Sequence, residues 1–411
     1  MHRCKLSAIS CVCNICTLSL LGLLWLWPWG VQAQETVPAP PPGLGALQPQ
    51  PVGVVPVSFS LLPFLSFNRN VQGFPLNHFS INATAEVAGP LSGMEISGLG
   101  SYRDGDVSGL QISGLCNFNR GRLGGLQVAG LSNVVLGRAA GMQVGGLYNL
   151  SVGPWRGLQV SGLLNQAWSS MDGLQIGGLM NHVAGNARGL QVAGVMNHVH
   201  GEFRGLQLGG VLNFAGGVRG MQLGLINVSR GEVKGFQLGL VNVAPASAFS
   251  LGLVNVVPGG RNGLALVLNS TGSVDLESKN GGKYWHTLIS LGQERREGFG
   301  EGGRTLLGLG FGVHFPGSGQ VVWNIDAYHR QKYFHEDTFM GSTLRLALDL
   351  PLAPHLFLSL GGGLTVFVYD GNLDGPDSLF GGWMPRDGHD RATRHEVRII
   401  PEFSLGLSCL F

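Results

Sequence analysis

The sequence predicts an all-β protein in which an eight-stranded antiparallel membrane barrel carries an inserted parallel β-solenoid of 15–16-residue repeats. Two observations predict this class. A phrase rich in glycine, glutamine and asparagine recurs at a fixed period, which indicates a repeat architecture. Segments with alternating apolar residues flank the repeats, and period two is typical of half-buried strands.

Composition narrows the function classes. Charged residues make up only 12% of the 411 residues, and glycine accounts for 68 of them. That balance excludes a charge-rich disordered chain. The net charge of +2 indicates no nucleic-acid partner.

Residues 1–33 have the pattern of a cleaved secretory signal. Arg3 and Lys5 form a basic start, an apolar run covers 18–27, and small residues precede cleavage after Ala33. A retained membrane anchor is the rival interpretation. The first four cysteines precede most of the apolar run, which argues against lipid attachment, and Cys116 and Cys409 fit no disulfide framework or metal spacing. Residues 34–56 are proline-rich and predict an extended linker.

Residues 57–88 are expected to form the first two barrel strands, at 57–67 and 79–87. Residues 284–411 are expected to form the other six. These six strands cover 284–291, 306–315, 321–333, 343–350, 356–368 and 397–411. An even strand count suits an outer-membrane barrel, and long and short connections alternate along it as they do in such barrels.

The repeat domain is expected over 93–270. Its opening glycines recur every 16 residues and then every 15. They are Gly93, Gly109, Gly125, Gly141, Gly157, Gly173, Gly189, Gly205, Gly220 and Gly235. Loss of one residue in a continuous strand would turn every later side chain to the other face, whereas a glycine corner absorbs it. One solenoid coil per repeat is therefore expected.

Leu, Ile and Val of each coil are expected to stack inward, as Leu174 and Ile176 would. The glutamines at 16-residue intervals, Gln111 to Gln207, are expected to form an outer ladder. The asparagines Asn117 to Asn213 are expected to form a second ladder at a corner. The alternative is one large barrel of about twenty strands. It is supported by apolar residues before the asparagine, such as Met180 and Met196.

The final strand, which alternates apolar residues and ends in Phe411, resembles the assembly signal of bacterial outer-membrane barrels. The phrase at 173–181, Gly-Leu-Gln-Ile-Gly-Gly-Leu-Met-Asn, resembles the surface-repeat proteins of the Leptospira and Bacteroidetes type. The likeness covers nearly the whole mature chain. It implies a location in the bacterial outer membrane and this architecture, but no activity.

Two candidate metal sites stand out. Asp370, Asn372 and Asp374 match the first half of a calcium loop, although position twelve is glycine. His182 and His198 lie one repeat apart and could share a metal. Turn residues and solvated histidines are the simpler interpretations. No other cofactor is expected.

Three functions remain open. The first is a non-catalytic structural or interaction protein, in which the barrel contacts outer-membrane lipid and the repeats meet an envelope or surface partner. The second is an outer-membrane pore, which would follow from the large barrel. The third is a hydrolase using Ser378, His389 or His395 of a long loop. With the solenoid between barrel strands two and three, strand parity favours the periplasmic side, whereas the resemblance favours the cell surface.

Overall fold

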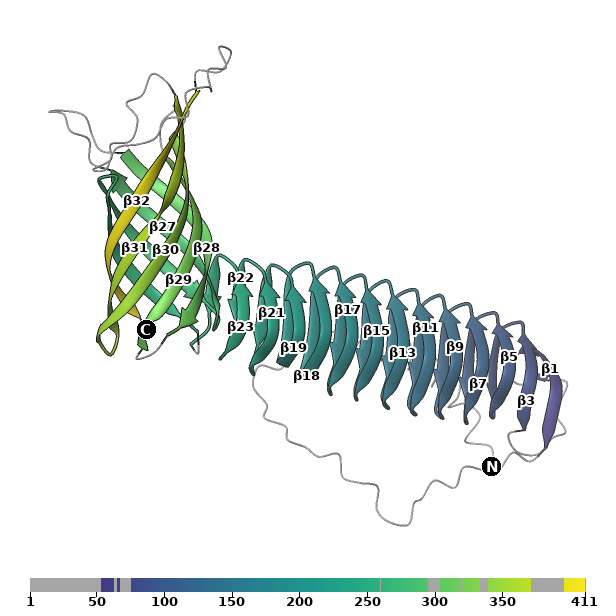
Figure 1. The fold of residues 1–411 in the computed structure, drawn as a ribbon. Coiled ribbons are helices and arrows are strands. Elements are labelled where there is room, and N and C mark those ends of the chain that lie inside the picture. The colour runs from purple at the N-terminus through teal and green to yellow at the C-terminus, as the bar shows by residue number, and fades with distance from the viewer. Residues whose placement is uncertain are drawn as a thin grey trace. The chain divides into compact units, whose positions relative to one another are not determined.

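The computed structural model describes residues 53–62, 65–66, 75–258, 260–294, 304–317, 320–332, 339–370 and 395–410. All regular elements in these ranges are strands, apart from a single 3-10 residue at Gln320 (Figure 1). The expected signal at 1–33, most of the linker and Phe411 lie outside the described residues. The chain divides into two compact units, Met1–Ala193 and Gly194–Phe411.

The described part of the first unit consists of solenoid coils. Each full coil has a long strand and a short strand, and these strands pair in parallel with their equivalents one coil away. The two-residue β2 is the exception, because it pairs antiparallel with β1. The strands are β1(Val54–Leu62), β2(Leu65–Ser66), β3(Leu76–Asn82), β4(Ala85–Ala88), β5(Leu91–Ser97), β6(Gly100–Arg103), β7(Val107–Ser113), β8(Cys116–Asn119), β9(Leu123–Ala129), β10(Ser132–Val135), β11(Ala139–Gly145), β12(Tyr148–Ser151), β13(Trp155–Ser161), β14(Leu164–Ala167), β15(Met171–Gly177), β16(Met180–Val183) and β17(Ala187–Ala193).

The second unit begins with further coils and ends in a closed barrel. Its coil strands are β18(Met196–Gly209), β19(Leu212–Leu223), β20(Ile226–Ser229), β21(Val233–Leu238), β22(Val241–Val243), β23(Ser247–Leu251) and β24(Val254–Val256). Its barrel strands are β25(Asn262–Asn269), β26(Ser273–Gly281), β27(Trp285–Glu294), β28(Arg304–Pro316), β29(Val322–Lys332), β30(Phe339–Ala353), β31(Leu356–Asp370) and β32(His395–Leu410).

The parallel register confirms the solenoid. Gly109 pairs with Gly125 and Gln111 with Gln127, each one period of 16 residues away. The alternative of one barrel with about twenty strands is wrong, because up-and-down barrel strands would pair antiparallel.

Residues 57–88 do not form barrel strands, contrary to the expectation from the sequence. β1 pairs in parallel with β3, Val57 opposite Phe79, and both belong to the first coils of the solenoid. Their alternating pattern suits either kind of half-buried strand, so the pattern alone could not separate them. The solenoid therefore precedes the barrel and is not inserted into it.

The barrel lies wholly at 262–410 and closes through the pairing of β25 with β32. The six expected C-terminal strands are confirmed with small shifts of their ends. The missed pair is β25 and β26. The segment Leu266-Val267-Leu268-Asn269 falls within the repeat domain expected at 93–270, but it lies in β25 of the barrel. The repeat domain therefore ends near Val257 and not at residue 270.

The faces of the coil are the reverse of those expected. Gln175 is fully buried, whereas Ile176 is 39% exposed. Alternation along the long strand is as predicted, but the glutamines point inward and the Leu, Ile and Val of the phrase point outward. Water around the coils would drive such aliphatic side chains inside, so their outward position is opposite to what an aqueous surrounding favours.

The opening glycines are needed because adjacent coils approach closely at that position. Gly109 has φ +134°, and a Cβ there would lie 1.9 Å from the carbonyl oxygen of Gly93. The corner glycines form a second such column, where a Cβ on Gly114 would lie 2.0 Å from the Gly98 oxygen. Side chains at these positions would force the coils apart.

Candidate functional sites: buried polar networks and an apolar repeat surface

The buried glutamines form a ladder with one direction. In the first unit each amide donates from Nε2 to Oε1 of the glutamine one coil earlier, over 2.6 to 2.9 Å. In the second unit Gln222 and Gln237 repeat this pattern. Ser250 donates to Gln237 Oε1 over 3.2 Å. The last glutamine oxygen of the ladder therefore accepts from a hydroxyl in place of another amide.

The asparagine ladder has the opposite direction. Asn117 donates from Nδ2 to Asn133 Oδ1 over 2.9 Å, which lies one coil later, and the following asparagines do the same. Asn117 also donates to the Val128 carbonyl over 2.9 Å. Ser113 donates to Asn117 Oδ1 over 2.6 Å and starts the ladder. Both ladders therefore satisfy amides that are removed from water.

The asparagine ladder of the second unit ends on the barrel. Asn242 donates to Asn255 Oδ1 over 2.8 Å. Asn255 Nδ2 then donates to the Asn280 backbone oxygen and to Asn280 Oδ1, both over 3.1 Å. A barrel strand, β26, therefore supplies the terminal acceptor.

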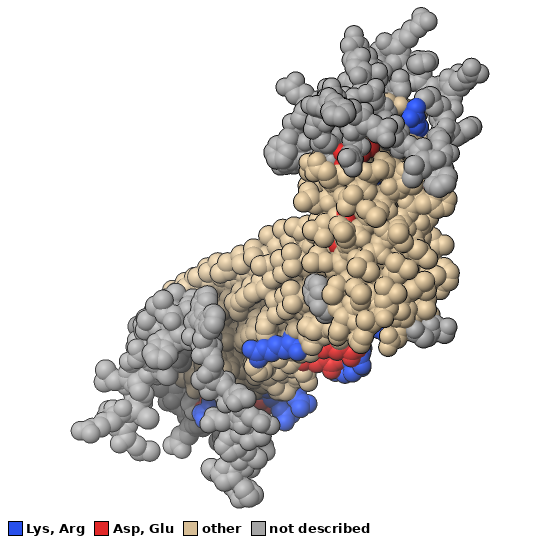
Figure 2. All heavy atoms as spheres, turned by 90° about the vertical axis from the view of Figure 1, so that its left-hand side faces the viewer, with Lys and Arg blue, Asp and Glu red and all other residues tan. Residues whose placement is uncertain are grey.

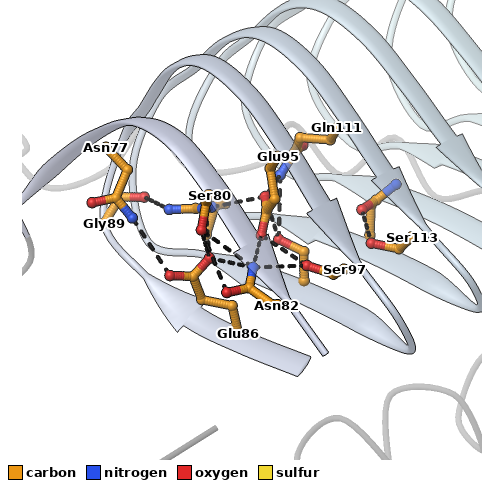
Figure 3. A network of polar contacts seen from close by, with 12 residues as sticks. Asn77, Ser80, Asn82, Glu86, Gly89, Glu95, Ser97, Gln111 and Ser113 are labelled. Atoms are coloured by element: carbon orange, nitrogen blue, oxygen red, sulfur yellow. Dashed lines mark hydrogen bonds and ion pairs between the residues drawn. The ribbon is translucent and has the colours of Figure 1, made fainter. Parts of the chain in front are cut away.

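A charged cluster closes the N-terminal end of the ladders in the first unit. Arg103 donates from Nη2 to Glu86 over 2.9 Å and from Nε to Glu95 over 3.0 Å, and all three side chains are buried. Figure 3 shows Glu86 and Glu95 converging on the polar side chains of Ser80 and Asn82.

The register explains why these charges lie there. Glu95 aligns with Gln111 in the glutamine column. Glu86 aligns with Ser101, which aligns with Asn117 in the asparagine column. The carboxylates therefore replace amides in the first coils. Gln111 Nε2 donates to Glu95 over 2.9 Å, and an ionised carboxylate can only accept, so Glu95 ends the ladder.

The two carboxyl groups of this cluster differ in pKa. Burial raises the pKa of Glu86 above its ordinary value of 4.5, although Arg103 opposes that effect. Burial would also raise the pKa of Glu95, but Arg103 and hydrogen bonds from Gln111 and Ser101 outweigh it and lower the pKa below 4.5. The cluster thus contains one carboxyl that favours ionisation and one that resists it.

The barrel lumen is filled by a second network. Arg345 makes two hydrogen bonds to Glu277, over 2.8 and 2.7 Å, and reaches Asp326 over 2.9 Å. Lys279 and His286 also contact Asp326, each over 2.8 Å. These side chains come from four different strands, and they tie opposite walls of the barrel together.

Side chains also fill the rest of the described lumen. Arg330 bridges Asp275 over 3.1 Å and Glu402 over 2.6 Å. A cavity of about 20 Å³ beside Arg345 and Asp349 has room for about one water. Eight strands enclose a space that side chains just fill, so the described lumen is a packed core.

The outer surface of the coils is apolar at one corner. The residue after each corner glycine forms a corner column, and its exposed fraction lies between 38% and 56%. In the first unit the column contains Leu99, Leu115, Leu131, Leu147, Leu163 and Leu179. In the second unit it contains Val195, Val211, Leu225, Leu240 and Leu253.

The charged residues lie on the side of each coil opposite the corner column. Between residues 75 and 257, every charged residue outside the Glu86–Glu95–Arg103 cluster lies in the turn after a short strand or near the start of the next long strand. This charged edge contains Asp104, Asp106, Arg120, Arg122, Arg138, Arg156, Asp172, Arg188, Glu202, Arg204, Arg219, Arg230, Glu232 and Lys234. On the face drawn in Figure 2, blue and red atoms of the repeats gather in one band.

The expected metal sites gain no support within the described residues. No group of three or more His, Cys, Asp or Glu that could hold a metal lies there. Asp370 ends β31 without a described side chain, and Asn372 and Asp374 lie outside the described residues. His182 and His198 are half-buried and belong to different units, and the His198 ring lies 4.8 Å from that of Phe214. Both sites stay predictions.

The candidate hydrolase residues are not tested either. Ser378 and His389 lie outside the described residues, and His395 starts β32 without a described side chain. Among the described residues, no helix is long and apolar enough to cross a membrane. No family model, curated protein or solved structure matches the chain.

Glu86, Glu95 and Arg103 were not expected from the sequence. One signal was available: Gly93-Met94-Glu95-Ile96 is a repeat phrase with glutamate in the glutamine position. A charge in a column of amides indicates either an exposed column or a buried ion pair. Outward glutamines would make an exposed column sufficient to explain Glu95, so the sequence predicted no ion pair.

Proposed function

We propose that this chain is a non-catalytic protein of the bacterial outer membrane, exported with cleavage after Ala33. Its barrel serves as the anchor and its coils present a repeat surface. The observation that carries this proposal is the polarity of the barrel, which has apolar side chains on its outer wall and charged side chains in its lumen. In β30, Leu344 and Leu346 point outward with 60% and 52% exposure, whereas Arg345 between them is 4% exposed. Apolar residues outside and charges inside suit a wall surrounded by lipid.

The chain path supports a position of the coils at the periplasmic end of the barrel. β25 starts where β32 ends, since Gly263 pairs with Leu410, so the coils join the barrel at the rim of the chain's last strand. This rim has the short connections 282–284, 317–321 and 354–355. The long connections, 295–303, 333–338 and 371–394, leave from the opposite rim, which also has the short connection 270–272. Outer-membrane barrels have short periplasmic turns and longer outer loops.

A pore is the weaker alternative, because it depended on a barrel of about twenty strands. The lumen network of Arg345, Glu277 and Asp326 also argues against a wide channel. The likeness to bacterial surface-repeat proteins supports an envelope role but would favour the outer face for the coils.

Expression in a Gram-negative host tests this function. We expect the full chain in the outer-membrane fraction, with a band whose gel mobility changes on heating, and no steady current in planar bilayers. Recovery in the soluble fraction without a heat-modified band would contradict the anchor. Large steady currents would favour the pore.

A further inference from the structure

We propose that the corner column and the uncharged faces of the coils are immersed in one leaflet of the bilayer that holds the barrel. The charged edge would then lie at the lipid headgroups. This inference rests on the proposed function, because it requires a barrel anchored in lipid, and it names the partner of the repeat surface as acyl chains.

The first argument is the distribution of polarity in the coil. The interior contains the amide ladders, which satisfy themselves, and the exterior carries half-exposed aliphatic residues such as Leu174 and Ile176 in coil after coil. Monomeric soluble proteins rarely expose large continuous apolar surfaces. Parallel pairing between coils also satisfies the backbone without water, which a lipid environment demands.

The second argument is the separation of charge from the apolar corner. Each coil is amphipathic across its width, with the charged edge at one end and the corner column at the other. The charged edge contains nine Arg or Lys and five Asp or Glu, a basic excess that suits anionic headgroups. Trp168 lies in the turn between β14 and β15 on this edge and is 56% exposed. Tryptophan is enriched at membrane interfaces.

The third argument is the depth of the last coil relative to the barrel rim. Both belong to the second unit. At the charged end of β23, the Ser247 carbonyl accepts a hydrogen bond from the Lys283 amide over 2.7 Å, in the short turn at the barrel rim. At the corner end, the Gly252 carbonyl accepts a hydrogen bond from Thr287 Oγ1 over 2.6 Å. The corner therefore lies inward from the rim, at the level of the lipid-facing band.

The neighbouring barrel strand supports that level. Thr287 pairs with Phe311 of β28, which is 50% exposed on the outer wall of the barrel. Leu253, at the corner of the last coil, directly follows Gly252 and is 48% exposed. A corner at this depth would contact the same acyl chains that surround the barrel wall.

The fourth argument is the width of a coil. Arg156 on the charged edge and Leu163 on the corner are seven residues apart, which spans about 23 Å in an extended strand. Half of a bilayer with its headgroup region is about 20–22 Å thick. A coil standing upright thus fits one leaflet, with its charges in the headgroups.

Depth-dependent fluorescence quenching tests this inference. All six cysteines of the full chain are replaced by serine, and single cysteines are labelled with the NBD fluorophore. The protein is placed in phosphatidylethanolamine–phosphatidylglycerol vesicles that contain doxyl-labelled acyl chains, and iodide is added in water. The corner sites are Leu163→Cys and Leu240→Cys. The matched edge sites in the same coils are Arg156→Cys and Lys234→Cys, and Leu309→Cys on the barrel wall is the reference.

We expect the ratio of doxyl to iodide quenching at the corner sites to match that at Leu309. It should exceed the ratio at the edge sites about fivefold or more, because hydrocarbon excludes iodide. Heat-modified mobility checks that each variant is folded. Corner sites quenched by iodide, with Leu309 quenched by lipid, would overturn this inference and leave the anchor intact. Corner sites shielded from both quenchers would indicate a second protein copy and would also overturn it. A Leu309 site quenched by iodide would overturn the anchor itself.

Discussion

Gln111 donates from Nε2 to the Glu95 carboxylate over 2.9 Å, and this contact ends the glutamine ladder at its donor side. Because each glutamine donates to the coil before it, the coil before Gln111 must offer an acceptor. Glu95 meets that need, and Arg103 supplies the compensating charge. The Arg103 cluster is therefore a cap for the amide ladder, although β3 and β1 stack beyond it.

Arg103→Leu should unfold the first coils locally. It leaves Glu86 and Glu95 buried without their cation, which costs about 3–5 kcal/mol. Loss of hydrogen-exchange protection over residues 76–113 measures this effect. The triple change Arg103→Leu, Glu86→Gln and Glu95→Gln is the control, since it removes all buried charge and extends the amide ladder. Unchanged protection in the single variant would show that the cluster is not a cap.

The stability of these coils should depend on pH in two opposed ways. Glu86 has a raised pKa, so its contribution is present below 4.5 and is lost as pH rises through its folded value. Glu95 has a lowered pKa, so its contribution is present above 4.5 and is lost as pH falls through its folded value. Acidification from neutral pH should first increase protection of the first coils, and further acidification should reduce it. Glu86→Gln should abolish only the first change, and an initial gain that persists in this variant would contradict the assignment.

Gln175→Leu should destabilise the coils although leucine is the more apolar residue. Gln175 donates to Gln159 over 2.8 Å and accepts from Gln191 over 2.7 Å. Removing it leaves two buried amide groups unpaired, at about 1–3 kcal/mol each. Leu174→Gln, next to it on the outer face, is the matched control in detergent solution. Equal protection in both variants by hydrogen exchange would contradict the buried ladder.

Gly109→Ala should be far more damaging than Gly124→Ala. At Gly109 the new methyl would meet the Gly93 oxygen at 1.9 Å in a backbone of φ +134°. Strain and overpacking together cost about 2–5 kcal/mol. At Gly124 the nearest atom is 3.9 Å away, so alanine fits. Hydrogen exchange over β7 and β9 compares the two, and similar protection would mean that the coils are not stacked this closely.

Leu346→Arg should weaken the barrel in lipid more than Leu352→Arg. Both leucines point outward, 52% and 57% exposed, but Leu346 is the middle residue of β30 and Leu352 is near its end. Arginine on the lipid face costs about 2–4 kcal/mol at the midplane and about 0–1 near the interface. Urea unfolding in vesicles gives both values. Equal values would indicate that the wall faces water.

The repeat period predicted the solenoid well, because a shortened repeat that keeps its pattern requires a corner and not a continuous strand. It also predicted both ladders. The orientation of the glutamines could not be predicted correctly, since alternation defines two faces but does not say which medium surrounds them. β25 was missed because Leu266-Val267-Leu268-Asn269 satisfies the end of the repeat phrase and also alternates as a strand. The Glu95–Arg103 pair joins different strands, and register alone brings it together.

The most direct test of the account is a cryo-electron microscopy reconstruction of the full chain in a lipid nanodisc. We expect lipid density around the barrel wall at Leu346 and against the corner at Leu240, with Lys234 outside the acyl layer. Coils that stand clear of the lipid disc, with Leu240 in water, would contradict the account of the repeats. A barrel outside the disc would contradict its central claim.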